Sequence, residues 1–411
     1  MKNKLFFTIC APNYLAQAII SYKSFKFENP DIEYKIILVS EQIDELLIKS
    51  VPRNDVILHS DVVSRDFIAW YSFKYTVIEY CTLLKPYLLK HFLAFPGIQY
   101  ASYIDPDTRF YNNIRTIYDE LGDGAVHVTP HLIDMKEIDY NPYPEYLHLW
   151  EGIFNLGYIT VKESAKTNVF LSWWINRLND YCYADKFDGL HTDQKWIDYA
   201  PTFLGQDIVI SNNYGLNVAH WNFSERKVIE LDNNIVVNGH SLVFWHFSGF
   251  NPNSENLNKN NAFGLSDIDS ASLHHIFKSY KKELLSIGYN YFSSLNYEYH
   301  ELQSGESLNI LTRRLFRVYS ENNNSGSESE ILQKFQSILK KKGILTNSAG
   351  SDFSYGRAGL KSKRGKLKFI HFGLKVFLKL FGAHNYLLLI RLMQYLGRVE
   401  NHSFLISDEK E

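Results

Sequence analysis

The chain has 411 residues, of which 45% are hydrophobic and 15% aromatic, and its formal net charge at pH 7 is −2. This composition is typical of a folded protein with a large apolar core and excludes a chain that is disordered throughout. The small net charge and the lack of a nucleic-acid motif exclude nucleic acid as an expected partner. Cys10, Cys81 and Cys182 are far apart in apolar segments, which favours free thiols in a reducing cytosol.

We expect no secretory signal at the N-terminus. The apolar run at residues 5–10 contains Thr8 and ends before Pro12, so it is too short for a signal peptide. No uninterrupted apolar run elsewhere is long enough for a confident transmembrane prediction. We therefore expect a cytoplasmic protein.

Strand-like and helix-like patterns alternate through the first 160 residues. The predicted strands are residues 5–10, 34–39, 99–104, 125–129 and 154–161, and the predicted helices are residues 14–27 and 71–92, the second interrupted by Pro86. Alternation of this kind predicts an α/β fold with a mostly parallel sheet and helices on both faces.

The first predicted strand ends at Ala11-Pro12-Asn13-Tyr14, where a helix follows. Free backbone amides at such a helix start can face a nucleotide. A plain strand-to-helix turn accounts for the same residues, and no glycine-rich phosphate loop is present.

Two carboxylates, Asp105 and Asp107, follow the strand predicted at residues 99–104 and are separated by Pro106. The proline bends the chain, so both side chains can leave the sheet edge where ligands of open α/β sheets collect. Carboxylate oxygens bind Mg²⁺ and Mn²⁺, which also bind substrate phosphates. The pair therefore indicates a metal-held diphosphate, although an Asx turn accounts for it when it is considered alone.

Several segments around this pair resemble, in order, the GT-A nucleotide-sugar transferases, and in particular glycosyltransferase family 8 and its bacterial relatives. They are LFFTICAPNYL (5–15), EYCTLLKP (79–86), GIFNLGYI (152–159), HTDQKW (191–196) and WHFSGF (245–250). The resemblance covers about residues 5 to 260 and implies a GT-A fold, which is Rossmann-like, and a nucleotide-sugar donor.

The resemblance also implies a ligand set for the metal and the diphosphate. Asp105, Asp107 and His246 would hold Mn²⁺ (or Mg²⁺), with His246 and Gly249 in a His-x-x-Gly segment. Lys85 would approach the sugar or its phosphates. The Lys-Pro-Trp sequence that usually follows in family 8 is absent here, and Lys259 is either its substitute or a surface lysine.

The sugar site implied by the resemblance contains Asn155 as a donor contact and the Asp193-Gln194 pair on its floor. The transfer would be retaining: Lys85 and the metal would stabilise the leaving diphosphate, and Asp193 or Gln194 would steady the oxocarbenium-like centre. The same residues are also compatible with purely structural roles. These roles are a solvated lysine at a helix kink for Lys85, a core histidine for His246, an amide joining two loops for Asn155, and a helix N-terminus for Asp193.

The character of the chain changes after residue 260. We expect a catalytic domain at residues 1–265, a helical extension at 266–320 with helices at 270–291 and 301–319, a flexible polar linker at 321–331, and a basic amphipathic helical region at 332–411. The arginine cluster at residues 313–317 (Arg-Arg-Leu-Phe-Arg) could bind an anionic acceptor or lie on a solvated helix face.

Residues 357–398 carry ten lysines and arginines and no acidic residue, with apolar residues between them. This pattern predicts either a helix on an anionic membrane surface or a helical hairpin packed on the catalytic domain with its lysines outward.

Together these features predict a metal-dependent, retaining glycosyltransferase that uses a UDP-sugar. Its acceptor would be a cell-surface glycan or a lipid-linked oligosaccharide, and the protein would be cytoplasmic with peripheral contact at the inner face of the cell membrane. The alternatives are a nucleotidyltransferase that makes nucleotide-sugars and a catalytically silent glycan-binding domain.

Overall fold

The computed structural model describes residues 3–135, 143–231, 234–254, 270–302, 304–323, 325–345 and 364–407. The chain divides into two compact units. The first, which we call the sheet unit, contains residues 1–64 and 77–297, and the second, the helical unit, contains residues 65–76 and 298–411. This division departs from the expected boundaries, because residues 270–297 belong with the sheet unit and residues 65–76 with the C-terminal helices.

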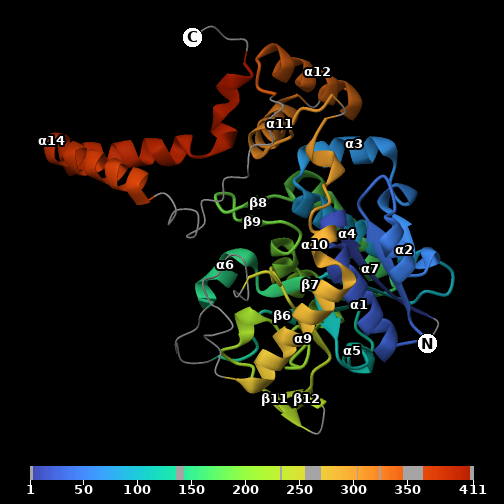
Figure 1. Cartoon of the computed structure of the whole chain (residues 1–411). Helices are drawn as coiled ribbons and strands as arrows, with labels where there is room; N and C mark the ends of the chain where they lie inside the picture. Colours follow the sequence, from blue (N-terminus) through green and yellow to red (C-terminus); the bar gives the residue numbers. More distant parts are fainter. Residues whose placement is uncertain are drawn as a thin grey trace. The chain divides into compact units, whose positions relative to one another are not determined.

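A seven-stranded sheet with the order β10-β6-β7-β4-β1-β2-β3 organises the sheet unit (Figure 1). Its strands are β1 (Lys4–Cys10), β2 (Glu33–Leu38), β3 (Val56–Leu58), β4 (Tyr100–Ile104), β6 (Val126–Pro130), β7 (Phe154–Lys162) and β10 (Ile208–Ile210). All neighbouring strands are parallel except at β7, which is antiparallel to both of its neighbours. The predicted α/β fold with a mostly parallel sheet is confirmed.

Helices cover both faces of this sheet. Phe6 of β1 contacts Phe25 of α1 (Leu15–Glu28), with ring centroids 4.8 Å apart. Phe7 contacts Phe92 of α4 (Val77–Leu93), with ring centroids 5.1 Å apart. Because successive strand residues point to opposite faces, α1 and α4 lie on opposite sides of the sheet.

The remaining elements of the sheet unit are short, apart from α7 and α9. They are α2 (Glu45–Ser50), β5 (Thr108–Phe110), α5 (Arg115–Leu121), α6 (His148–Glu151), α7 (Ala165–Tyr181), β8 (Ala184–Asp185), β9 (Leu190–His191), α8 (Ala200–Leu204), β11 (Val228–Leu231), β12 (Asn234–Val237), β13 (His240–Ser241), β14 (Phe244–His246), α9 (Ala271–Ile287) and α10 (Tyr289–Phe292). The helix expected at residues 270–291 is therefore present, with a break at Gly288 in the left-handed region.

The helix expected at residues 71–92 is corrected by the structure. The chain forms α3 (Arg65–Lys74) and then α4, with the break at residues 75–76, and Pro86 lies inside α4. Packing of the buried face of α4 outweighs the hydrogen bond that Pro86 cannot donate.

The helical unit contains α3, α11 (Ile310–Asn322), α12 (Glu328–Lys341) and α14 (Arg364–Leu396). Phe316 of α11 packs against Phe73 of α3 at 4.9 Å and against Phe335 of α12 at 5.1 Å. The helix predicted at residues 301–319 starts later, at Ile310, because Asn309 accepts a hydrogen bond from the Thr312 amide and caps it.

The linker predicted at residues 321–331 is also shorter than expected. Ser327 and Glu330 form a capping box at the start of α12, so residues 328–331 are helical. The polar sequence that suggested flexibility contains the Ser-x-x-Glu pattern of a helix N-terminus.

The arginine cluster is buried, which contradicts the solvated helix face expected for it; binding of an anionic acceptor stays a prediction. Arg313 donates to the backbone carbonyls of Phe73 (2.9 Å), Tyr75 (2.5 Å) and Ser72, all at the C-terminal end of α3. Arg314 and Arg317 lie 3.5 and 3.6 Å from Glu400. The cluster therefore holds the helical unit together.

Candidate active site

The three predicted metal ligands meet at the carboxyl end of β4. Asp105 and Asp107 occupy the turn between β4 and β5, and β5 pairs with β14 so that His246 lies opposite Thr108. The Nε2 atom of His246 is 3.1 Å from Asp107 Oδ1 and 3.4 Å from Asp105 Oδ2. One ligand atom from each residue lies within 4.8 Å of the others.

The chemistry of this group suits a hard divalent cation. The two carboxylates match the preference of Mn²⁺ and Mg²⁺ for oxygen ligands, and Asp107 and His246 are both buried. Burial opposes protonation of His246, but the Asp107 and Asp105 carboxylates outweigh it and raise the pKa of the imidazole. Among the described residues, buried Nδ1 of His246 has no hydrogen-bond partner.

The backbone amide of Gly249 also contacts this group through Asp107. Burial opposes ionisation of Asp107, but His246 and the backbone amides of Asp107 and Gly249 lower the pKa of the Asp107 carboxyl. Gly249 has φ 67°, a left-handed conformation that favours glycine.

Lys85 is buried beside the metal group, which excludes a solvated lysine at a helix kink. Its ammonium lies 3.0 Å from Asp193 Oδ2 and 3.8 Å from Asp105 Oδ1, and donates to the Leu156 carbonyl at 2.9 Å. Burial lowers the pKa of Lys85, but Asp193 and Asp105 outweigh it and raise the pKa above its usual value. The lysine therefore stays charged between two carboxylates.

Asp193 is 1% exposed and does not cap a helix, so a role at a helix N-terminus is excluded. Its Oδ1 accepts a hydrogen bond from the Thr192 hydroxyl at 3.0 Å. Thr192 has φ 49°, which is rare for a β-branched residue and stores backbone strain next to the carboxylate. Strain of this kind is common at functional sites.

Asn155 and Gln194 join neighbouring loops. Asn155 Oδ1 accepts from the Gly157 amide at 3.0 Å and from Asn217 Nδ2 at 3.0 Å. Gln194 Oε1 accepts from the Leu156 amide at 2.9 Å, and its Nε2 donates to the Glu151 carbonyl at 2.9 Å. Both amides are thus positioned by the backbone around the start of β7, and their contact with a sugar stays a prediction.

The turn predicted to contact a nucleotide forms a 3-10 helix at Pro12–Tyr14, which includes Asn13. Ala11 precedes this short helix, and α1 follows it. Burial and the charges of Asp107 and Asp105 raise the pKa of Tyr14, so this turn lies close to the metal group. β1 and β4 are parallel neighbours, which brings their carboxyl ends to the same sheet edge.

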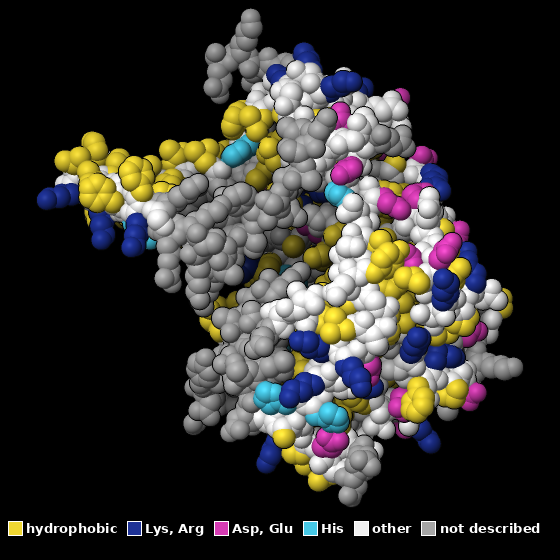
Figure 2. Space-filling model, viewed as in Figure 1, with side chains coloured by type: hydrophobic (Ala, Val, Ile, Leu, Met, Phe, Trp, Pro, Cys, Tyr) yellow, Lys and Arg dark blue, Asp and Glu magenta, His cyan; other side chains and the backbone are white. Residues whose placement is uncertain are grey.

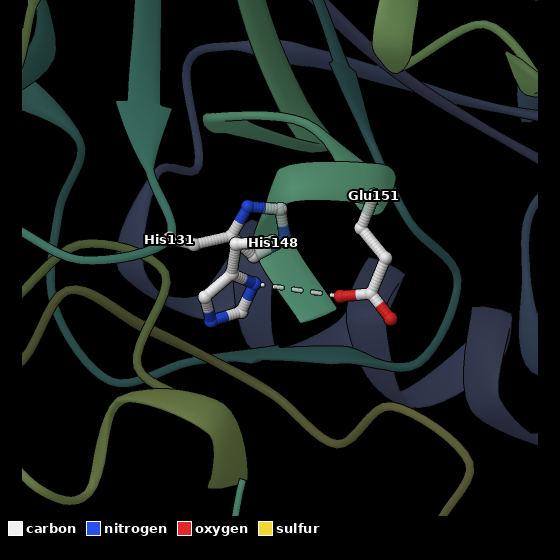
Figure 3. Close-up of side chains that lie close together, drawn as sticks. All are labelled: His131, His148 and Glu151. Carbon is white, nitrogen blue, oxygen red and sulfur yellow. Dashed lines mark ion pairs between the residues drawn. The ribbon is translucent and has the colours of Figure 1, made fainter. Parts of the chain in front are cut away.

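A second cluster, His131, His148 and Glu151, was not anticipated from the sequence (Figure 3). His131 follows β6, and the other two side chains come from α6. His148 Nδ1 lies 3.4 Å from Glu151 Oε2, and the Tyr143 hydroxyl donates to Glu151 Oε1 at 2.5 Å. Burial opposes ionisation of Glu151, but these partners lower its pKa to about 2.

This cluster is organised for hydrogen bonding. The rings of His131 and His148 stack with centroids 4.4 Å apart and an interplanar angle of 20°. His131 Nδ1 donates to the Gly152 carbonyl at 2.9 Å, and its Nε2 lies 3.2 Å from Asn155 Nδ2. The cluster therefore holds Asn155 in place. Its residues have common types and spacings, so no motif could have identified them.

Lys259, the suggested substitute for the missing Lys-Pro-Trp lysine, lies outside the described residues.

Comparison with known proteins gives relatives at low identity. No family model matches the chain. Two Bacillus subtilis (strain 168) proteins align with it: "Uncharacterized protein YfnF", 25% identical over 245 residues (59% of this chain and 80% of that protein), and "Uncharacterized protein YfnD", 26% identical over 181 residues (43% and 55%).

Several glycosyltransferases are among the solved structures that are similar to the chain. They include the galactosyltransferase LgtC (TM-score 0.42, 13% identity, covering 69% of this chain and 96% of that one) and mouse xyloside xylosyltransferase 1 (TM-score 0.36, 15% identity, 60% and 97%). A third is the glycosyltransferase GlyE of Streptococcus pneumoniae (TM-score 0.39, 11% identity, 85% and 66%).

Proposed function

We propose that the chain is a metal-dependent glycosyltransferase that uses a nucleotide-sugar, with a UDP-sugar as the expected donor. The observation that carries this proposal is the convergence of Asp105, Asp107 and His246 beside the buried Lys85–Asp193 pair. A cation held by the first three residues would bind the donor diphosphate and neutralise the charge that develops on the leaving group.

Lys85 adds a second fixed positive charge on the same side. Its ammonium is held by Asp193, Asp105 and the Leu156 carbonyl, so it does not need to reorganise when the leaving group becomes more negative. The Ala11–Tyr14 turn lies near Asp105 and Asp107, and it is the proposed contact for the nucleoside.

The donor sugar would lie next to Asp193, Gln194 and Asn155. Asp193 supplies a carboxylate for an oxocarbenium-like centre, while the two amides shape the pocket that selects the sugar. We propose retention of configuration, in which a leaving-group oxygen receives the proton of the acceptor hydroxyl. The proposed acceptor is a cell-surface glycan or a lipid-linked oligosaccharide, and the proposed location is the cytoplasm.

Donor hydrolysis tests this function without a known acceptor. Purified protein should slowly release UDP from one member of a UDP-sugar panel when Mn²⁺ is present, and chelation should abolish the release. Asp105→Asn/Asp107→Asn should lose it, because both cation-binding carboxylates are neutralised. Asp123→Asn, which removes a fully exposed carboxylate, should keep it.

Two results would contradict the proposal. Metal-independent release that survives in the double variant would remove the role of the metal group. Formation of a nucleotide-sugar from UTP and a sugar phosphate would instead favour the nucleotidyltransferase.

A further inference from the structure

The helix α14 exposes an apolar surface that the described part of the chain leaves uncovered. Within residues 367–396, an 18-residue window has a mean hydropathy of 1.3, so the helix is long and apolar enough by composition to cross a membrane, which the sequence did not indicate. None of this span is buried. The exposed large side chains are Phe369, Ile370, Phe372, Val376, Leu378, Leu380, Phe381, Leu387, Leu388, Leu392, Met393, Tyr395 and Leu396.

Three lysines in the first half of α14 lie on one side of the helix. Lys368, Lys375 and Lys379 are seven and four residues apart, so they fall within about 40° of one another around a helix. Ile370 and Phe381 lie on the opposite side, and both are exposed. Figure 2 shows this separation, with apolar side chains along one side of α14 and basic side chains projecting from the other.

The geometry of α14 favours a position in the plane of a membrane surface. Gly382, with φ 75° and ψ 171°, breaks the helix into halves at residues 364–381 and 383–396. These halves are about 27 and 21 Å long, and each is shorter than the roughly 30 Å hydrocarbon core. A straight crossing would also place the lysines in hydrocarbon, which is costly.

The C-terminal end of α14 is fixed to the rest of the helical unit. The 3-10 helix at Val399–Leu405 follows it directly and carries Glu400. Glu400 lies 3.5 Å from Arg314 and 3.6 Å from both Arg317 and Arg398. A membrane-bound α14 would therefore hold the helical unit near the surface.

We propose that α14 binds an anionic lipid surface, lying in the interface with its apolar side among the acyl chains and its lysine stripe toward the headgroups. Charge complementarity selects this occupant, because residues 364–396 contain no acidic side chain. The proposal rests on α14 alone and is independent of the transferase activity.

Flotation of the full-length protein with vesicles tests this binding. It should float with vesicles of equal parts phosphatidylcholine and phosphatidylglycerol, and binding should weaken as salt is added. It should not float with phosphatidylcholine alone. Lys368→Gln/Lys375→Gln/Lys379→Gln should bind roughly a hundredfold more weakly, and Ile370→Ser/Phe381→Ser should also lose binding.

The matched control removes three exposed lysines of the sheet unit, Lys23, Lys278 and Lys282, and should leave flotation unchanged. If this control variant lost flotation to the same extent, the effect of the α14 lysines would be one of net charge alone, and the proposal would be overturned. Lack of wild-type flotation, or equal flotation with neutral vesicles, would also overturn it. A further result would overturn the proposal. In that case, sedimentation would show a dimer that Ile370→Ser/Phe381→Ser dissociates, and vesicles would bind no protein.

The orientation of α14 relative to the membrane needs a separate measurement. Alkaline carbonate should release the protein from cell membranes, as expected for a helix in the interface. Protein that resists carbonate would contradict the in-plane position. Manganese-dependent UDP binding measured on the same variants keeps the two proposals apart, because the α14 substitutions should not change it.

Discussion

Gly157 occupies a position where no side chain fits. A Cβ atom there would lie 2.5 Å from His246 Cε1 and 2.7 Å from Asn155 Oδ1. We expect Gly157→Ala to weaken manganese-dependent UDP binding more than tenfold, because His246 must shift from its present position beside Asp107. Calorimetric titration measures this, with Gly373→Ala as the control, since open space surrounds that glycine. Unchanged affinity in Gly157→Ala would contradict the ligand role of His246.

The Lys85–Asp193 pair combines stability with the proposed chemistry. Lys85→Met should destabilise the sheet unit by about 3–5 kcal/mol, because it leaves the buried Asp193 carboxyl without its ion-pair partner. Lys85→Met/Asp193→Leu should recover part of that loss in urea unfolding followed by tryptophan fluorescence. Donor hydrolysis should be lost in Lys85→Met and should not return in the double variant. Recovered hydrolysis would show that the pair is purely structural.

Glu120 gives a test of pH dependence away from the site. Burial opposes its ionisation, but hydrogen bonds from His127, Ser211 and Asn213 lower its pKa from 4.5 to about 2. A lowered folded-state pKa adds stability above about pH 4.5, and this stability is lost as the pH falls toward 2. Glu120→Gln should therefore lower the Tm at pH 7, and the difference should shrink below pH 4.5. A constant Tm difference across this range would contradict the assignment.

Residue types and positions allowed part of the site to be predicted from the sequence. Asp105, Asp107 and His246 each follow or end a strand-like run, so their position at a sheet edge could be inferred. The His131–His148–Glu151 cluster could not, because it depends on the placement of the four-residue helix α6 against the end of β6.

Among the elements, α3 is capped at its C-terminal end by Arg313. Arg313 donates to the carbonyls of Phe73 and Tyr75, which a helix end leaves without intrahelical partners. Arg313→Met should destabilise the helical unit by roughly 3 kcal/mol or more, since several buried carbonyls lose their donor. Arg313→Lys should recover only part of this, because an ammonium lacks the fork of the guanidinium.

Unfolding followed by near-UV circular dichroism, together with UDP titration, measures this effect. UDP binding by the sheet unit should persist at temperatures where the helical unit has lost its structure. Equal stability of the wild type and Arg313→Met would contradict the capping role.

Element types were easier to predict than element boundaries. Strand runs rich in Ile, Val and Phe identified five strands, because buried parallel strands are apolar on both faces. Pro86 was expected to interrupt a helix, yet tertiary packing keeps it inside α4. In the segment at 321–331, polarity suggested a linker although Ser327 and Glu330 encode a helix start.

At the scale of the whole molecule, the division into two units was the least predictable feature. Residues 65–76 lie between two segments of the sheet unit in sequence but pack with α11 and α12, more than 230 residues later. No local sequence pattern marks the inclusion of residues 65–76 in the helical unit, because it depends on which apolar helix faces pack together. The α/β fold followed from alternation of patterns along the chain, which is a local property.

The proposed function depends on a cation that is held by Asp105, Asp107 and His246 and binds a nucleoside diphosphate. Calorimetric titration of UDP into the full chain measures this binding, with Mn²⁺, with chelator, and with Asp105→Asn/Asp107→Asn. We predict binding that requires Mn²⁺ and disappears in the double variant, while Asp123→Asn binds like the wild type. Equal UDP binding under all of these conditions would contradict the metal site and the function built on it.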